Sequence, residues 1–248
     1  MTVTKVINFA HRGASAACPE NTMAAFRRSL ELGATGIETD VQLTKDGHMV
    51  LIHDESVDRT TNGKGYIKDK TLKEVRALDA GAWFQDGAFA GEKIPLLEEL
   101  LELLANRDTL LNIELKNGIF HYPGMEQKVI AAIRQYDMSD RVIISSFNHY
   151  SLVHFKELAP DIETGILYME GLYRPWDYAL TLGAQALHSY HPAVLPEFVS
   201  EAAAAGIVYH PWTVNDPKRM QELIEAGVDG IITDVPDVLA GILARKGH

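Results

Sequence analysis

The chain has 248 residues and a formal charge of −11, from 23 basic and 34 acidic side chains. An acidic surface repels nucleic acid and anionic lipid headgroups, so we expect neither as a partner of the whole surface. Hydrophobic residues make up 46% of the sequence, which is ample for the core of a soluble, enzyme-sized domain. The single cysteine, Cys18, excludes an intrachain disulfide and suits a reducing compartment.

The N-terminal residues lead directly into a strand pattern, without a charged segment followed by a long apolar one. We therefore expect no secretory signal, no membrane-spanning segment and a cytoplasmic location. We also expect one domain over residues 1–248 and no stable membrane association. The sequence leaves open whether the chain forms a homodimer.

The first part of the chain predicts a strand, a helix and a hairpin. In order these are a strand at residues 5–10, a helix at 19–32, and strands at 36–44 and 49–53, which the turn signal at 45–47 joins. The next segment, residues 55–93, is rich in Gly, Asn and Thr and offers only one short helix, at residues 70–78. So long an irregular stretch predicts a small insertion that covers part of the domain.

A regular alternation of helices and strands follows the insertion. Helices are predicted at residues 95–104, 124–136, 149–158, 175–182, 196–205, 217–226 and 236–244. Strands are predicted between them at residues 110–116, 141–146, 164–168, 184–188, 207–214 and 230–233.

Only the strand at residues 49–53 follows its predecessor without a helix, and its short turn permits only antiparallel pairing. Eight helix-separated strands remain, which predicts a (β/α)8 TIM barrel with an antiparallel hairpin strand and a small insertion after the second barrel strand. A doubly wound open sheet is the alternative. It is weaker because no GxGxxG pattern follows the first strand.

In a (β/α)8 barrel the active site lies at the C-terminal ends of the strands. The polar residues at the early strand ends, with one from the hairpin, are His11, Arg12, Glu38, Asp40, His53, Glu114 and Lys116. Later strand ends add Ser145, Ser146, Tyr168 or Glu170, His188, Trp212 and Asp234. Such a convergence of charged groups is costly for stability, which indicates a functional site.

Three carboxylates on neighbouring strands, Glu38, Asp40 and Glu114, suit a hard divalent cation such as Mg²⁺ or Ca²⁺. Zinc would be better served by His and Cys clusters, which the chain lacks. The alternative is an ion-pair network in which Arg12 and Lys116 balance the carboxylates without a metal. Three carboxylates outnumber two cations, which favours the metal.

Two histidines at this end of the barrel, His11 and His53, are candidates for a general acid and a general base because imidazole titrates near neutral pH. The alternative for each is a core histidine bonded to a backbone carbonyl. Arg12 and Lys116 suit an anionic oxygen. Trp212 is equally consistent with stacking on a substrate and with packing at the barrel top.

Several of these residues lie in motifs that resemble the glycerophosphodiester phosphodiesterases. The motifs are at residues 11–13, 19–22, 38–47, 52–54, 58–63, 114–116, 146–147, 212–215 and 229–236. They cover essentially the whole chain, and the cytosolic bacterial branch is the nearest match. The resemblance implies a barrel with a small insertion after the second strand.

The resemblance also implies roles for individual residues. It places the metal ligands on Glu38, Asp40 and Glu114, the acid and base on His11 and His53, and substrate or phosphate contacts on Arg12, Glu20, Lys116 and Trp212. The implied reaction is metal-dependent hydrolysis of a glycerophosphodiester to glycerol 3-phosphate and an alcohol, with Mg²⁺ or Ca²⁺ as cofactor. The alternatives are a lysophospholipase-D-type or phosphoinositide-cleaving enzyme, and a non-catalytic barrel that binds phosphorylated ligands.

Overall fold

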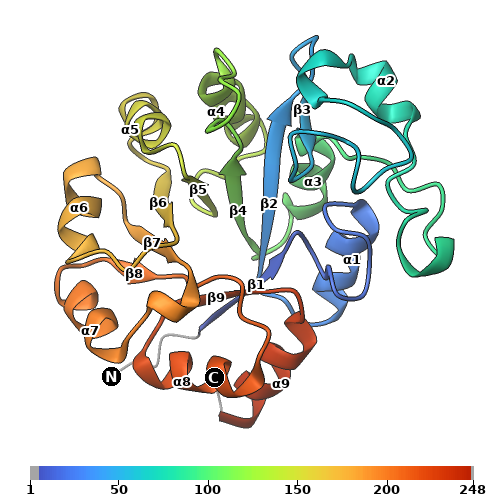
Figure 1. The fold of residues 1–248 in the computed structure, drawn as a ribbon. Helices are drawn as coiled ribbons and strands as arrows, with labels where there is room; N and C mark the ends of the chain where they lie inside the picture. Colours follow the sequence, from blue (N-terminus) through green and yellow to red (C-terminus); the bar gives the residue numbers. More distant parts are fainter. Residues whose placement is uncertain (1–5, 247–248) are drawn as a thin grey trace.

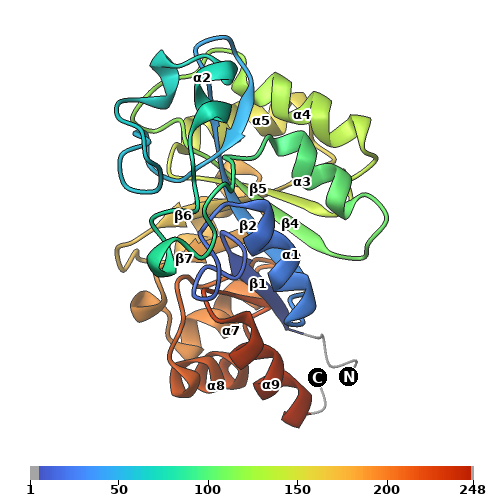
Figure 2. The same ribbon diagram turned by 90° about the vertical axis from the view of Figure 1, so that its right-hand side faces the viewer.

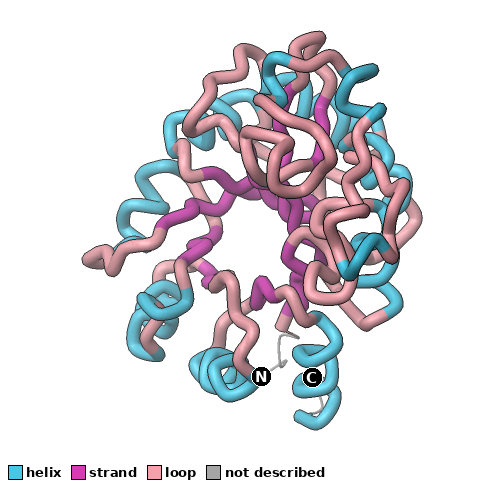
Figure 3. Tube along the Cα trace, turned by 45° about the vertical axis from the view of Figure 1, so that its right-hand side comes forward, coloured by secondary structure: helices cyan, strands magenta, loops and turns pink. Residues whose placement is uncertain are grey.

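The computed structural model describes residues 6–246, and its centre is a ring of parallel strands with helices around the outside (Figures 1 and 3). The strands are β1 (Ile7–His11), β2 (Gly36–Leu43), β3 (Met49–Leu51), β4 (Leu110–Leu115), β5 (Val142–Ser146), β6 (Glu163–Tyr168), β7 (Ala186–Ser189), β8 (Val208–Tyr209) and β9 (Gly230–Thr233). Along the ring they follow the order β8-β7-β6-β5-β4-β2-β1-β9.

Two backbone hydrogen bonds join the ends of this sheet. Ile232 N donates to Pro211 O at 3.0 Å, and Val214 N donates to Ile232 O at 2.9 Å. The extended segment after β8 therefore lies against β9. The eight-stranded (β/α)8 barrel predicted from the alternation is confirmed, and the open doubly wound sheet is wrong.

Helices connect successive barrel strands on the outer face of the ring (Figure 3). They are α1 (Met23–Glu31), α3 (Leu97–Leu104), α4 (Met125–Gln135), α5 (His149–Leu158), α6 (Pro175–Leu182), α7 (Pro196–Ala204), α8 (Pro217–Ala226) and α9 (Pro236–Lys246). Their apolar sides and the outward side chains of the strands form one large buried cluster. None of the helices between residues 6 and 246 is both long and apolar enough to cross a bilayer.

Strand β3 pairs antiparallel with β2, as the short turn requires. The register sets Val41 opposite Leu51 and Leu43 opposite Met49, so the hairpin is centred on Asp46. Beyond the strand, Ile52 N donates to Asp40 O at 3.1 Å. The hairpin therefore returns the chain to the C-terminal half of β2.

The insertion at residues 55–93 contains η1 (Ile67–Asp69), α2 (Leu72–Ala77) and η2 (Gln85–Gly87). It has a small hydrophobic cluster of its own, shared with the end of the hairpin and the start of the following segment: Val50, Ile52, Val57, Ile67, Val75, Ala80 and Ile94. Figure 2 shows the part around α2 projecting beyond the barrel, at the upper left.

The largest difference from the sequence prediction is in β8. The pattern predicts a strand over residues 207–214, whereas the structure has only Val208–Tyr209 and an isolated bridge at Trp212. Pro211 O accepts from Ile232 N, so the N–H that proline lacks would have faced β9, and the segment makes one bond fewer there. Toward β7, His210 N and Trp212 N still donate to Leu187 O and Ser189 O.

Candidate active site

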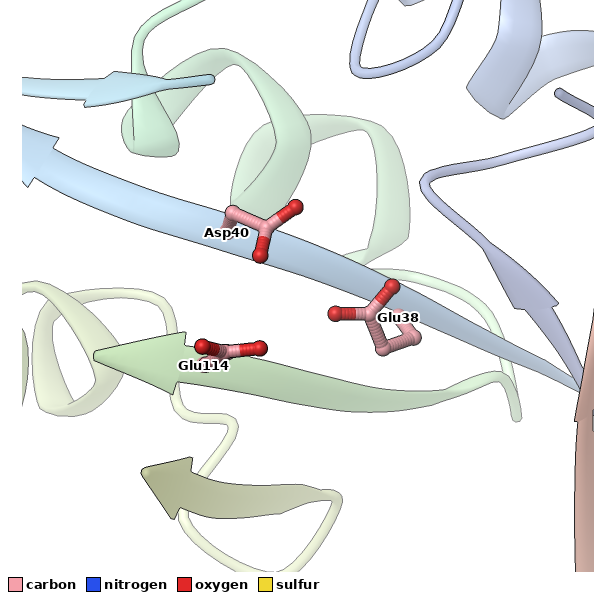
Figure 4. A group of neighbouring side chains, drawn as sticks. All are labelled: Glu38, Asp40 and Glu114. Atoms are coloured by element: carbon pink, nitrogen blue, oxygen red, sulfur yellow. The ribbon is translucent and has the colours of Figure 1, made fainter. Parts of the chain in front are cut away.

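Strand register alone brings the three predicted metal ligands together. Glu38 and Asp40 are two residues apart on β2, so they share one face, and Asp40 is paired with Glu114 on the neighbouring β4. Figure 4 shows the three carboxylates between these two strands. One oxygen from each lies within 4.8 Å of the others, and all three residues are buried.

Negative charge is concentrated here beyond what the nearby cations balance. Burial and the neighbouring Asp40 raise the pKa of Glu38 well above its usual range. Burial likewise raises the pKa of Glu114 to about 7, although Lys116 opposes the shift. Glu38 forms no ion pair with any described residue. A divalent cation between the three carboxylates would supply the missing positive charge, so the residues fit a metal.

Asp40 is the most strongly held of the three carboxylates. Burial by itself raises its pKa, but Arg12, His53 and Lys116 together hold the pKa below the usual range of an aspartate. Asn21 Nδ2 also donates to Asp40 Oδ2 at 2.9 Å. Asp40 is therefore ionised whenever the site is assembled.

Arg12 adopts a left-handed backbone conformation, with φ of 56°. This conformation directs its N–H toward Glu38 Oε2 at 3.0 Å, while its guanidinium lies 2.9 Å from Glu20 Oε1 and 3.4 Å from Asp40 Oδ2. The next residue, Gly13, is also left-handed, and a Cβ there would lie 2.6 Å from the backbone of Ala25. The sharp turn after β1 therefore requires this glycine.

Lys116, directly after β4, is the second cation of the site. Its Nζ is 2.9 Å from Glu114 Oε1, 3.2 Å from His53 Nε2 and 4.0 Å from Asp40 Oδ1. The ammonium group thus links a predicted metal ligand to a predicted catalytic histidine.

Each of the two predicted catalytic histidines has a carboxylate at its Nδ1. His11 Nδ1 lies 2.6 Å from Asp234 Oδ1, and His53 Nδ1 lies 2.8 Å from Asp54 Oδ1. Hydrogen bonds from Arg59 and then His53 lower the pKa of Asp54 to about 2. Burial opposes the shift at Asp234, but the hydrogen bond and charge of His11 lower its pKa to about 2. Both carboxylates are therefore ionised, and the imidazole N–H is the donor in each pair. Nε2 is then the nitrogen that each histidine offers to the cavity.

A cavity of about 60 Å³ lies between these groups. Its polar wall is His11, Arg12, Glu38, His53 and Glu114, with Asn112 and Ser145 beside them. Its apolar wall is Phe147, Leu167, Trp212 and Ile232. Trp212 is fixed there by its Nε1, which donates to His188 O at 2.7 Å, and by an edge-on contact with Phe147. The cavity can therefore hold a small ligand with one ionic and one apolar side.

The structure brings together all nine residues predicted for the site, with Glu20, Asp40 and Lys116 directly behind the cavity lining. His188, a weaker candidate at the end of β7, is not at the mouth. It is fully buried within the barrel, where its Nε2 lies 3.1 Å from His210 Nδ1. Burial lowers its pKa well below the usual value, so it is a neutral core histidine.

Sequence reasoning named Asp234 only as a polar residue at a strand end, and it gave no role to the other residues that orient the site. Asp54 orients His53, Asp234 orients His11, and Asn21 binds Asp40. The position of Asp54 directly after a candidate histidine and that of Asp234 at the last strand end were the available signals. Asn21 and Arg59, which donates to Glu20 and Asp54, lie in loops. Both fall inside motifs of the family resemblance, at residues 19–22 and 58–63, but their spacing alone indicated no role.

The comparisons with known proteins agree with this geometry. The model of the "Glycerophosphoryl diester phosphodiesterase family" matches residues 11–238. A glycerophosphodiester phosphodiesterase from Caldanaerobacter subterraneus is 54% identical over 98% of this chain and 99% of its own length. One from Bacillus altitudinis is 47% identical over 95% of this chain and 96% of its own.

A solved structure of an Oleispira antarctica phosphodiesterase, in complex with the product sn-glycerol-3-phosphate, superposes with a TM-score of 0.85. It is 31% identical and covers 95% of this chain and 96% of its own. A putative glycerophosphoryl diester phosphodiesterase from Silicibacter pomeroyi has a TM-score of 0.91 at 31% identity, over 98% of this chain and 95% of its own. The chain therefore belongs to the glycerophosphoryl diester phosphodiesterase family.

Proposed function

We propose that this enzyme hydrolyses glycerophosphodiesters, such as glycerophosphocholine and glycerophosphoethanolamine, to glycerol 3-phosphate and the free alcohol. The observation that carries the proposal is one small cavity that lies beside a cluster of three buried carboxylates and two histidines, each oriented by a further carboxylate. The relative from Oleispira antarctica with bound sn-glycerol-3-phosphate supports the product.

Glu38, Asp40 and Glu114 would hold one divalent cation, Mg²⁺ or Ca²⁺. Three carboxylates with no sulfur or nitrogen ligand are the donor set that these hard cations prefer. A cation held there would supply positive charge that stabilises the negative charge growing on the phosphate.

Arg12, which lines the cavity, binds the phosphate, and Lys116 reaches it from directly behind the lining. Glu20 does not reach the cavity, but it accepts a hydrogen bond from Arg12 and so orients the guanidinium. Trp212 belongs to the apolar wall and packs against the carbon atoms of the substrate. The ionic and apolar walls thus fix the phosphate and the glycerol chain in one orientation.

His53 is the general base. Lys116 Nζ can only donate a hydrogen bond, so His53 Nε2, 3.2 Å away, accepts it and carries no proton. Burial also lowers the pKa of His53. The ammonium group therefore keeps this nitrogen unprotonated until substrate arrives, when Lys116 can turn to the phosphate.

His11 is the general acid at the other end of the reacting phosphate. His53 takes the proton of the nucleophile, the nucleophile forms a new P–O bond, and the bond to the alcohol oxygen breaks. His11 then delivers a proton from Nε2 to that oxygen. The nucleophile is either water or the neighbouring glycerol hydroxyl, and in the second case the cyclic phosphate is opened by water in a second step.

We further propose that the enzyme works in the cytoplasm without stable attachment to a membrane. The net charge of −11 opposes binding to anionic lipid. The thiol of Cys18 is free and buried, which suits a reducing compartment.

The direct test is release of glycerol 3-phosphate from glycerophosphocholine by protein treated with EDTA and then given Mg²⁺ or Ca²⁺. We expect no release after EDTA and full release after the cation is restored. Hydrolysis of lysophosphatidylcholine in preference to glycerophosphocholine would instead indicate the lysophospholipase-D-type reading. Absence of any diester hydrolysis with every metal would indicate a barrel that only binds phosphorylated ligands.

A further inference from the structure

One arginine outside the cavity is bonded to the partners of two proposed functional residues. Arg59, in the insertion, donates through Nη1 and Nη2 to the two oxygens of Glu20, each at 2.7 Å. It also donates through Nε and Nη2 to the two oxygens of Asp54, at 2.8 and 3.0 Å. A single guanidinium thus binds two carboxylates with four hydrogen bonds.

Each of these carboxylates faces a residue of the proposed mechanism on its other side. Asp54 Oδ1 accepts from His53 Nδ1 at 2.8 Å, and Glu20 Oε1 accepts from Arg12 Nη1 at 2.9 Å. The base and one phosphate-binding group are therefore connected through Arg59. Arg59 itself lines neither the cavity nor the neighbouring hollow beside His11.

The insertion holds Arg59 in place. Val57, two residues earlier, is fully buried in the hydrophobic cluster of the insertion, and its N donates to Gly65 O at 3.0 Å. Asp58 accepts from Gly65 N at 2.7 Å, and Thr61 Oγ1 donates to Val57 O at 2.7 Å. Hydrogen bonds hold the loop on both sides of Arg59. The backbone from which the Arg59 side chain extends is therefore fixed.

We propose that Arg59 is a positioning residue, and that the insertion serves catalysis by holding Arg59 across Glu20 and Asp54 so that Arg12 and His53 keep their reactive orientations. The arrangement requires arginine. Its planar guanidinium has five N–H donors and can bind two carboxylates with two hydrogen bonds each, whereas the ammonium group of lysine is a compact point charge. The Arg59 side chain is 45% exposed, so solvent screens its ion pairs, but bidentate pairs with two carboxylates also stabilise the fold. The tests of the proposal therefore measure kcat and side-chain orientation.

The inference rests on the proposed hydrolysis of glycerophosphodiesters, and Arg59→Gln tests it. We expect kcat to fall about 10–100-fold, as for other groups that orient reactive side chains, with KM changed by less than a factor of about three. Arg174→Gln is the matched control, because Arg174 is 47% exposed, pairs with Asp177 and, like Asp177, does not line the cavity. Its kcat should equal that of the wild type. An Arg59→Gln enzyme within about twofold of wild-type kcat overturns the proposal.

A second experiment, in a variant that lacks both carboxylates, distinguishes a positioning role of Arg59 from direct contact between Arg59 and the substrate. In a Glu20→Gln/Asp54→Asn enzyme the carboxylates that Arg59 orients are gone, so adding Arg59→Gln should cost less than about twofold more. An undiminished loss in that background would place Arg59 on the substrate and overturn the proposal. Arg59→Ala should regain kcat with millimolar guanidinium but not with methylammonium, and equal rescue by both ions would also overturn it.

A structural measurement, which needs no catalytic activity, tests this inference independently of the proposed function. Crystal structures of the wild type and of Arg59→Gln should differ in the side-chain orientations of His53 and Arg12. Unchanged orientations overturn the positioning role whether or not the enzyme hydrolyses glycerophosphodiesters. Wild-type protein without diester hydrolysis would overturn the proposed function instead. If Arg59→Gln fails to fold, Arg59→Lys serves in the same measurements, with a smaller loss expected because lysine retains the charge but not the fork.

Discussion

Asp234 and His11 are joined by a hydrogen bond of 2.6 Å between Oδ1 and Nδ1, and the carboxylate is itself held by Ser15 and Asn215. The four residues come from the β1 end, its following loop, the segment after β8 and the β9 end. The arrangement fixes the ring orientation of His11 and keeps Nδ1 as the donor to Asp234, so Nε2 is the nitrogen that delivers a proton from the imidazolium.

Replacing Asp234 with Asn should therefore impair His11 without displacing it. An amide can accept from Nδ1–H only in one of its two orientations and cannot stabilise an imidazolium by charge, so we expect kcat to fall by about 100-fold or more. Steady-state kinetics on glycerophosphocholine would measure the fall. Asp237→Asn, three residues later and exposed on α9, is the matched control. Equal activity of the two variants would contradict the role given to Asp234.

The roles of the two histidines can be separated with a leaving group that needs no proton. His11→Ala and His53→Ala should each lower kcat on glycerophosphocholine by about 10²–10⁴-fold. With glycerophospho-4-nitrophenol the leaving phenolate is a weak base. His11→Ala should then recover most of its activity, and His53→Ala should not.

If His53→Ala recovered its activity on the nitrophenyl substrate and His11→Ala did not, His53 would be the acid and His11 the base. Near-wild-type turnover of either variant on glycerophosphocholine would remove that histidine from the mechanism. His121→Ala, an exposed histidine in the segment after β4, controls for nonspecific effects of the substitution.

The barrel and most of its site could be predicted because they follow from periodicity. Strand ends of a parallel barrel meet at one edge, so residues such as Glu38 and Glu114 converge although 76 positions separate them. The antiparallel hairpin followed from the length of its turn, and its register about Asp46 placed His53 at the same edge. The bounds of several elements differ from the prediction, most of all those of β8, where only Val208–Tyr209 of the predicted residues 207–214 form a strand.

The orienting residues could not be predicted because no period describes where they lie. Arg59 meets Glu20 only because the insertion folds on its own hydrophobic cluster and returns over the loop after β1. Asn21 reaches Asp40 from a left-handed backbone conformation that sequence patterns do not reveal. Such contacts depend on the path of loops, which is set by tertiary packing.

The metal site should make metal-free protein less stable as the pH rises. Because the pKa of Glu114 is raised to about 7, the folded state binds more protons than the unfolded state between about pH 4.5 and 7. Stability is then lost as pH rises through this window. Metal-free Glu114→Gln should melt higher than metal-free wild type at pH 8, by on the order of 5 °C.

With a divalent cation present, the wild type should instead melt at a higher temperature than Glu114→Gln. Mg²⁺ or Ca²⁺ stabilises wild type by binding only the folded state, and this stabilisation should weaken below pH 7, where protons compete for Glu114. Glu114→Gln should respond weakly to either ion in the same thermal scans. The exposed Glu163→Gln should behave as wild type. A metal-free Glu114→Gln protein that melts lower than wild type at pH 8 would contradict the excess of buried negative charge.

A directed hydrogen-bond chain inside the barrel predicts a second effect of pH. Ser145 Oγ donates to Asn112 Oδ1, so the Asn112 amide nitrogen faces His188 Nδ1, and His188 Nε2 then donates to His210 Nδ1. Both rings are neutral in this arrangement. Burial lowers the pKa of His210 to about 4 and that of His188 well below its usual value.

Acid should therefore destabilise the barrel well above the range where carboxylates titrate. Below pH 6.5 these histidines bind protons in the unfolded state but not in the folded state. The free energy of unfolding therefore falls as the pH drops from 6.5 toward 4. His210 alone accounts for a loss of about 3 kcal/mol at pH 4. His210→Asn keeps an acceptor for His188 and should flatten this dependence in urea unfolding measured at several pH values. His154→Asn, at an exposed position on α5, should keep the wild-type slope. Equal slopes for wild type and His210→Asn would show that His210 is protonated in the folded barrel.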